Sequence, residues 1–130
     1  MRKKEIRDRI KKYKAQSNHY FENALRYIEA CDAEKASEFL WGSMAEALKA
    51  VAVSRKNIRL RGHEGVKNYA MELARDLRDD SIRHTFDKAQ TLHRNFYESW
   101  LTLEDVATYA EDVKAAVGKL LSFIREEEPT

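Results

Sequence analysis

The sequence predicts an all-α fold, an antiparallel up-down bundle of four to five helices joined by short connections. Apolar residues recur every three or four positions over most of the chain, whereas the period-two alternation of β-strands is absent. The 130 residues include one Pro and four Gly, so few positions interrupt a helix. This length suits one domain, and we therefore expect a single helical bundle over residues 1–130.

The first predicted helix covers about residues 4–30. One of its faces carries apolar or small side chains at steps of three and four: Ile6, Ile10, Tyr13, Ser17, Tyr20, Ala24 and Ile28. With Phe21 and Tyr27 added, the helix has more aromatic surface than its own bundle needs. A homodimer would bury that surplus, although a bundle can also absorb it alone.

The second and third predicted helices flank a glycine-containing loop. Asp32 is a plausible N-cap for a helix over about residues 33–54. Its inner face would consist of Ala36, Leu40, Met44, Ala47, Leu48 and Val51, while Gly42 and its small neighbours allow another helix to approach closely. Gly62 and Gly65 mark a loop or helix junction. The third helix, near residues 64–78, would turn inward Val66, Tyr69, Ala70, Leu73 and Leu77.

The last two predicted helices begin with capping residues. Asp79, Asp80 and Ser81 precede a fourth helix over about residues 80–101, and Thr102 with Asp105 comes close to a capping box for a fifth over about 103–126. The inward residues of the fourth helix would be Ile82, Phe86, Ala89, His93, Phe96 and Trp100. Those of the fifth would be Val106, Tyr109, Ala110, Val113, Val117, Leu120 and Ile124.

Charge and composition exclude several classes of protein. A net charge of +2 excludes a strongly basic nucleic-acid binder of the histone type, although residues 2–14 and 55–61 are locally basic and could attract phosphate. The single Cys31 permits no disulfide framework and no multi-cysteine metal site. Since no signal peptide and no stretch of about 20 apolar residues is present, we expect a soluble, cytoplasmic protein without membrane contact.

His63 is the best candidate for a phosphate contact. It lies next to Gly62 at a predicted helix start, with Arg59 and Arg61 just before it. The exposed amides and positive end of a helix, together with guanidinium groups, form an anion-binding position. A capping loop whose arginines face solvent is the competing interpretation.

His93 occurs in the apolar stretch "QTLHRNFYESW" of residues 90–100. It could be a core histidine whose ring nitrogens are satisfied by a neighbouring helix, or it could lie at the mouth of a groove between helices. At 100° per residue, Asn95 and Tyr97 point to other faces of the helix, where they could line a second wall or an interface.

His84 has Asp80 and Asp87 at one-face spacing, but on a soluble helix such a trio is usually an ion-pair cluster. The Glu-x-x-His pairs of di-iron bundles are absent from the sequence. We therefore expect no metal site and no cofactor.

Three stretches resemble the archaeal PaREP family, which is placed in the HEPN superfamily of helical bundles. They are "SEFLWGSMAEALKAVA", then "GHEG", then "AQTLHRNFYESW", and the resemblance covers about residues 20–124. Within them, "LHRNFYE" and "LWGSMAEALKA" are the most specific parts. The resemblance implies a bundle of four to five helices, commonly dimeric, in a superfamily associated with nucleotide binding, RNA cleavage and toxin–antitoxin pairs.

The catalytic signature that the resemblance implies for HEPN ribonucleases is Arg, then four to six residues, then His. Arg78 and His84 have this spacing but lie across a predicted helix junction. Lys88 and His93 have it with Lys in place of Arg, and a lysine cannot form the bidentate guanidinium contact to phosphate. These departures argue against efficient ribonuclease activity.

Three hypotheses about function follow. The first is a dimeric, HEPN-like bundle that binds RNA or nucleotide phosphate without efficient catalysis, through His63, Arg59, Arg61, His93, Asn95 and Tyr97. The second is a structural module that binds a protein partner and has no role with nucleic acid. The third is a weak, metal-independent ribonuclease of the toxin–antitoxin type that uses His84 or His93.

Overall fold

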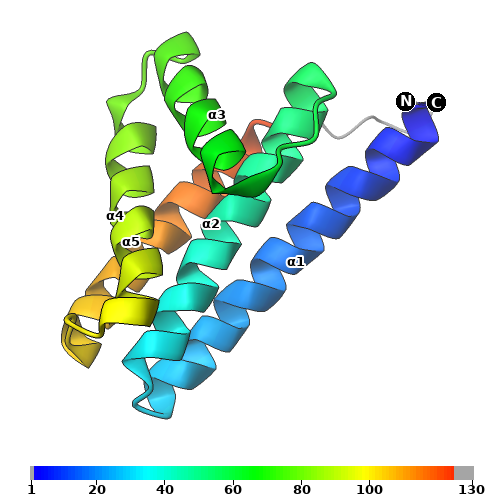
Figure 1. The fold of residues 1–130 in the computed structure, drawn as a ribbon. Coiled ribbons are helices and arrows are strands. Elements are labelled where there is room, and N and C mark those ends of the chain that lie inside the picture. Colours follow the sequence, from blue (N-terminus) through cyan, green and yellow to red (C-terminus); the bar gives the residue numbers. More distant parts are fainter. Residues whose placement is uncertain (1, 125–130) are drawn as a thin grey trace.

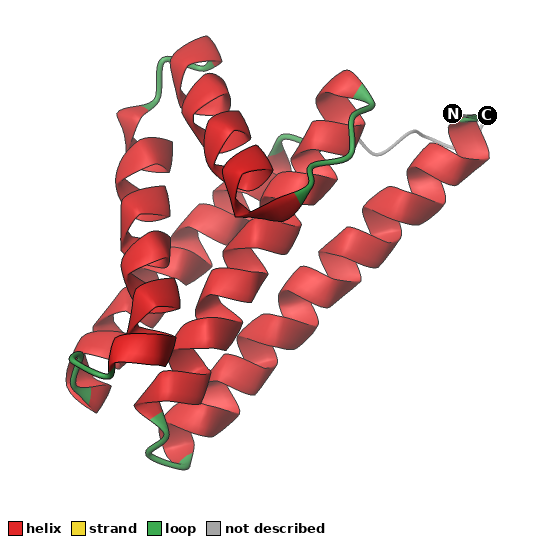
Figure 2. Ribbon diagram, in the orientation of Figure 1, coloured by secondary structure: helices red, strands yellow, loops and turns green. Residues whose placement is uncertain are grey.

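The predicted all-α fold is confirmed by a computed structural model, which describes residues 2–124 (Figure 1). Five helices follow one another along the chain: α1 (Lys3–Glu29), α2 (Ala33–Lys56), α3 (Gly62–Asp76), α4 (Asp80–Glu98) and α5 (Leu103–Ser122). Within these described residues there is no strand, and the segments between helices are short (Figure 2).

Helix α2 lies at the centre and packs against each of the other four helices. More than half of its residues are buried, because small side chains cover the faces that its apolar stripe does not. A side chain at Gly42 would bring its Cβ within 2.9 Å of the Tyr20 ring of α1. The hydroxyls of Ser17 and Ser43 each donate to the other residue's carbonyl, at 2.7 and 2.9 Å. The predicted close approach at this part of α2 is therefore present.

The predicted caps are also present. The Asp32 carboxylate accepts from the Lys35 amide at 3.0 Å and starts α2. Thr102 and Asp105 form a complete capping box at the start of α5. Each cap satisfies amide groups that the first turn of a helix leaves without a partner.

Helix boundaries differ from the predicted ones by a few residues. Helix α2 continues to Lys56, and α3 runs from Gly62 to Asp76 rather than from 64 to 78. Helix α4 ends at Glu98 rather than at residue 101, because Ser99 turns into the left-handed region with φ 53°. Helix α5 ends at Ser122, and the predicted end at residue 126 lies outside the described part of the chain.

The buried face of α4 is rotated from the predicted one. Ile82, Phe86 and Ala89 are buried as expected, but the next buried positions are Leu92 and Asn95 rather than His93 and Phe96. Beyond Ala89, the inward stripe continues by steps of three, which apolar spacing alone does not distinguish from steps of four. His93 therefore lies at the edge of the core, and Trp100 lies past the helix end with 47% of its surface exposed.

The aromatic residues of α1 pack largely within the chain. Tyr27 stacks on Phe39 at 5.5 Å between ring centroids, and Tyr20 contacts the same ring at 5.7 Å. Tyr13 and Phe21 are partly buried against the core. The bundle thus absorbs much of the aromatic surface on which the expectation of a dimer was based.

Candidate functional site

Four aromatic side chains from three helices meet at one place. Trp41 comes from α2, His63 from the first turn of α3, and His93 and Tyr97 from α4. The Trp41 ring centroid lies 4.9 Å from that of His63 and 5.0 Å from that of His93, and the two imidazoles are 5.4 Å apart. Tyr97 meets His93 edge-on at 5.7 Å. We call these four residues the aromatic cluster.

Two polar side chains hold the imidazoles of the aromatic cluster. Glu38 of α2 bonds His93, with 3.0 Å between Oε2 and Nδ1. Gln90 of α4 bonds His63, with 3.1 Å between Oε1 and Nε2. Because a carboxylate oxygen and an amide oxygen only accept, the neutral rings carry hydrogen on these nitrogens. Nε2 of His93 and Nδ1 of His63 are then left as acceptors.

The aromatic cluster has a buried floor and an open rim. Trp41 is 8% exposed and also touches the fully buried Phe86, with 5.7 Å between ring centroids. The His93 side chain is 25% exposed, His63 is exposed, and Tyr97 is 71% exposed. His93 is therefore neither sealed in the core nor free in solvent. Ring surface and ring nitrogens of both histidines belong to the same surface of the molecule.

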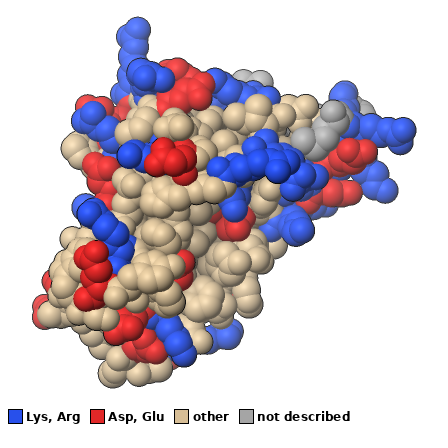
Figure 3. All heavy atoms as spheres, in the orientation of Figure 1, with Lys and Arg blue, Asp and Glu red and all other residues tan. Residues whose placement is uncertain are grey.

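Basic residues adjoin the aromatic cluster on the side of His63. Arg59 and Arg61 are exposed in the segment that joins α2 to α3, and neither forms a salt bridge within residues 2–124. Figure 3 shows Lys and Arg side chains gathered in the region where Figure 1 places this segment. No side chain caps the start of α3, where Gly62 has a left-handed φ of 66°. Arg59 and Arg61 thus lie in the segment just before the positive end of α3, whose first turn carries His63.

Asn95 belongs to the scaffold rather than to this surface. It is fully buried; its amide nitrogen donates to Ser37 Oγ at 3.0 Å, and its oxygen accepts from the Leu101 amide at 2.7 Å. These bonds tie the end of α4 to α2 and to the connection that leads to α5. Tyr97, by contrast, lies beside His93, because residues four apart share one face of a helix. The contact of Tyr97 with His93 corrects the prediction that Tyr97 points to another face of the helix than His93.

The residues considered for catalysis do not meet in one place. Lys88 forms an ion pair with Asp112 of α5 at 3.0 Å, whereas His93 is bonded to Glu38 of α2. His84 is exposed on α4, and Arg78 lies in the turn before that helix with φ 51°. Within the described residues, no group of three His, Cys, Asp or Glu side chains could hold a metal ion.

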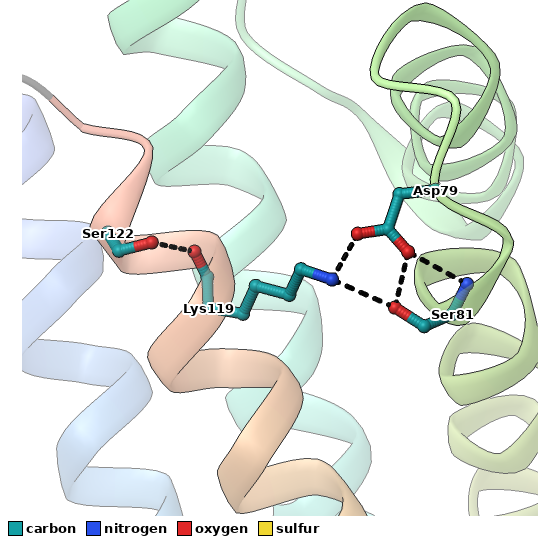
Figure 4. A network of polar contacts seen from close by, with 4 residues as sticks. All are labelled: Asp79, Ser81, Lys119 and Ser122. Atoms are coloured by element: carbon teal, nitrogen blue, oxygen red, sulfur yellow. Dashed lines mark hydrogen bonds and ion pairs between the residues drawn. The ribbon is translucent and has the colours of Figure 1, made fainter.

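A second group of polar residues joins α4 to α5, and we call it the α4–α5 seam; Figure 4 shows its Asp79, Ser81 and Lys119. Its members are Asp79, Ser81, Lys88, Asp112 and Lys119. Lys119 forms an ion pair with Asp79 and bonds Ser81 Oγ at 3.1 Å. The Lys119 ammonium, and then the Ser81 hydroxyl, hold the pKa of the Asp79 carboxyl below its usual range. A cavity of about 170 Å³ lies beside the seam, with Met44, Ile82 and Leu120 in its lining.

Sequence reasoning missed Glu38 and Gln90 as members of the site, and it interpreted Trp41 only as packing. A local signal was present for each. Glu38 and Trp41 lie three apart on α2, and Gln90, His93 and Tyr97 follow one another at three and four on α4. Such spacing places side chains on one face, but it does not show which two helix faces meet.

None of the helices in residues 2–124 has the length and apolar character to cross a membrane.

Comparison with known proteins gives a fold and a family. A crystal structure of a protein from Sulfolobus solfataricus has a TM-score of 0.72 to this chain at 23% sequence identity, covering 83% of this chain and 95% of that one. At this identity the likeness shows the fold alone. No curated protein matches the chain. The model of the archaeal PaREP1/PaREP8 family matches residues 12–117, so the chain belongs to this family.

Proposed function

We propose that the protein binds RNA or nucleotides through phosphate and base at the aromatic cluster, without efficient catalysis. One observation carries the proposal: His63 and His93, far apart in the sequence, meet over Trp41 at a partly exposed place, and the segment that leads to His63 carries the exposed Arg59 and Arg61. Aromatic faces next to unpaired guanidiniums are the two components that single-stranded nucleic acid needs, one for its bases and one for its backbone.

Single-stranded RNA fits this surface better than a duplex does. The bases of a duplex are stacked and paired, whereas those of a single strand can turn out and stack on Tyr or His rings. Tyr97 offers a ring that is 71% exposed, with His93 against its side. Arg59 and Arg61 would bind the flanking phosphates, since guanidinium groups match phosphate oxygens in pairs.

The pairing of Lys88 supports binding without efficient cleavage. In the HEPN-like signature, Lys88 would take the place of the catalytic arginine, and His93 would be the histidine that follows it. Its ammonium instead contacts Asp112 on α5, while His93 contacts Glu38 on α2. Two neighbouring imidazoles can still transfer protons, so slow cleavage that survives EDTA and requires His93 would favour the ribonuclease alternative.

The HEPN-like relationship and a homodimer are further parts of this proposal. A second copy would bury exposed apolar surface. Outside the aromatic cluster and the α2–α3 connection, this surface includes Trp100, which is 47% exposed, and Leu25, which is 44% exposed. The same exposed residues also suit a protein partner. A partner-binding module without any role with nucleic acid is therefore the second candidate function.

The test is the salt dependence of RNA binding. The affinity of the full chain for a fluorescent single-stranded RNA of about 12 nucleotides is measured by anisotropy at several salt concentrations. Each phosphate contact contributes about 0.7 to the slope of log affinity against log salt on a single strand. The double variant Arg59→Ala/Arg61→Ala should therefore reduce the slope by about 1.4.

A matched control removes the same charge elsewhere. Arg83 and Lys114 are exposed on α4 and α5, away from the aromatic cluster, and Arg83→Ala/Lys114→Ala should leave the slope close to that of the wild type. Undetectable binding by the wild type, or an equal loss of slope in both double variants, would remove the proposal and leave the partner-binding module.

A further inference from the structure

We propose that the aromatic cluster selects guanine over the other bases, and that Glu38 is the residue that recognises it. The inference rests on the proposed binding of RNA or nucleotides and deepens it by naming the base. It comes from the hydrogen-bonding groups around the rings, which are mainly acceptors on the side of Glu38.

Glu38 has capacity for a ligand. Its Oε2 accepts from His93, while its Oε1 forms no hydrogen bond within residues 2–124, and its side chain is 36% exposed. An ionised carboxylate offers about four lone-pair positions and no donor. The bond to His93 also fixes the orientation of the carboxylate, so a ligand does not have to order it.

The neighbouring ring nitrogens of the two neutral histidines also include hydrogen-bond acceptors. Since His93 donates through Nδ1 to Glu38, Nε2 of the neutral ring is an acceptor. His63 donates through Nε2 to Gln90, so its Nδ1 is an acceptor as well. The amide nitrogen of Gln90 is the donor of this group, and it has no hydrogen bond within the described residues.

Guanine matches this pattern on its Watson–Crick edge. It presents two adjacent donors, N1–H and the N2 amino group, which one carboxylate can accept together, and beside them the acceptor O6. Adenine and cytosine place a ring-nitrogen acceptor next to their amino group, and uracil flanks its single N–H with two carbonyls. These acceptors would face the oxygens of Glu38 and lose hydrogen bonds. The Gln90 amide group is the donor that suits O6.

The charges around the cluster orient such a ligand. Arg59 and Arg61 lie in the segment that follows the C-terminal end of α2, whereas Glu38 precedes Trp41 towards the N-terminal end of the same helix. Glu34, one turn further from Trp41, holds the Ser99 hydroxyl. Phosphate is thus attracted to the arginine side and repelled from the carboxylate side, which leaves the base edge to Glu38.

The test uses single-stranded RNAs of one length that differ at one base. An oligouridine of about 12 nucleotides receives a central G, A or C, or stays unchanged, so the number of phosphates is constant. We expect the G-containing strand to bind the full-length protein about tenfold or more tighter than the A, C and U strands. Inosine, which lacks the N2 amino group, should fall between G and the others.

Variants then assign the preference to Glu38. Glu38→Gln replaces the paired acceptors by one acceptor and one donor, and it should reduce the preference for G to less than about threefold while binding of the oligouridine persists. Glu22→Gln, an exposed change of the same kind on α1, should keep the wild-type preference. Circular dichroism shows whether each variant is folded.

The outcomes separate the two proposals. If all four strands bind equally, or if another base is preferred, the inference is overturned while the proposed RNA binding stands. If G is preferred but the folded Glu38→Gln variant keeps that preference, the role of Glu38 is overturned. If no strand binds, the proposed function fails and the inference with it. If Glu38→Gln does not fold, the wild-type series still tests the preference for G. The shorter Glu38→Asp variant, which should also lose this preference, then tests the role of Glu38.

Discussion

The aromatic cluster and the α4–α5 seam lie on different sides of α4, and they differ in how their polar groups are satisfied. In the seam, each lysine has an acidic partner: Lys88 pairs with Asp112, and Lys119 pairs with Asp79. In the aromatic cluster, each imidazole has one nitrogen bonded to a side chain and the other without a hydrogen bond within residues 2–124, where Arg59 and Arg61 likewise form no salt bridge. Paired charges join helices to one another, whereas exposed groups with unused hydrogen-bonding capacity can bind a ligand.

Asn95 gives the largest expected effect, because it is a scaffold residue adjacent in the fold to the aromatic cluster. Asn95→Ala leaves the Leu101 amide without its acceptor and opens a small cavity beside Ser37, so we expect a loss of about 3 kcal/mol in the free energy of unfolding. Urea unfolding measures it. RNA affinity per folded molecule should be nearly unchanged.

Asn18→Ala is the control for Asn95→Ala, because Asn18 is exposed on α1 and its loss should cost less than about 0.5 kcal/mol. A loss of RNA affinity in the folded Asn95→Ala variant, without the loss of stability, would return Asn95 to the site and weaken the contrast between scaffold and cluster.

The sequence predicted those parts of the fold whose causes are local. Asp32 caps α2 and Thr102 caps α5 through atoms three residues away, so the signal and the structure involve the same few residues. The small residues around Gly42 likewise predicted the close contact with another helix.

The site was predictable only in part, because its geometry depends on contacts between distant segments. His63, Arg59 and Arg61 were predicted from their position at a helix start, and that environment is local. The contact of Glu38 with His93 joins residues 55 apart and depends on how α2 and α4 face each other. Whether the core stripe of α4 continued through Leu92 or His93 likewise depended on packing, and the sequence alone favoured the wrong one.

Tyr97 gives the next effect, on binding instead of stability. With 71% of its surface exposed, Tyr97→Ala should change the free energy of unfolding by less than about 0.5 kcal/mol. Removing a ring on which a base stacks should weaken RNA binding by about 1–3 kcal/mol. Anisotropy and urea unfolding on the same samples measure both quantities.

His19→Ala removes an exposed ring from α1, outside the apolar surface that a second copy would bury, and is the control for Tyr97→Ala. It should alter neither quantity appreciably. Unchanged RNA affinity in Tyr97→Ala would mean that no base stacks on the exposed Tyr97 ring, and the proposed stacking surface would have to be abandoned.

The smallest expected effect belongs to the seam and appears as a pH dependence. The Lys119 ammonium and the Ser81 hydroxyl lower the pKa of Asp79 in the folded protein (Figure 4). A carboxyl whose pKa is lower when folded than when unfolded stabilises the fold above its unfolded pKa, and that contribution is lost as pH falls through the folded pKa. Asp79→Asn keeps a good N-cap residue but removes the charge. Its melting temperature should therefore lie slightly below that of the wild type at neutral pH, and the difference should shrink below about pH 4.

Asp80→Asn is the control, because it removes a neighbouring charge that does not contact Lys119. Its melting temperature should differ less from that of the wild type at neutral pH, as measured by thermal unfolding across the same pH range. If the difference in melting temperature between Asp79→Asn and the wild type stays constant down to acidic pH, the ion pair contributes nothing to the stability of the fold. The cap alone would then stabilise this end of α4.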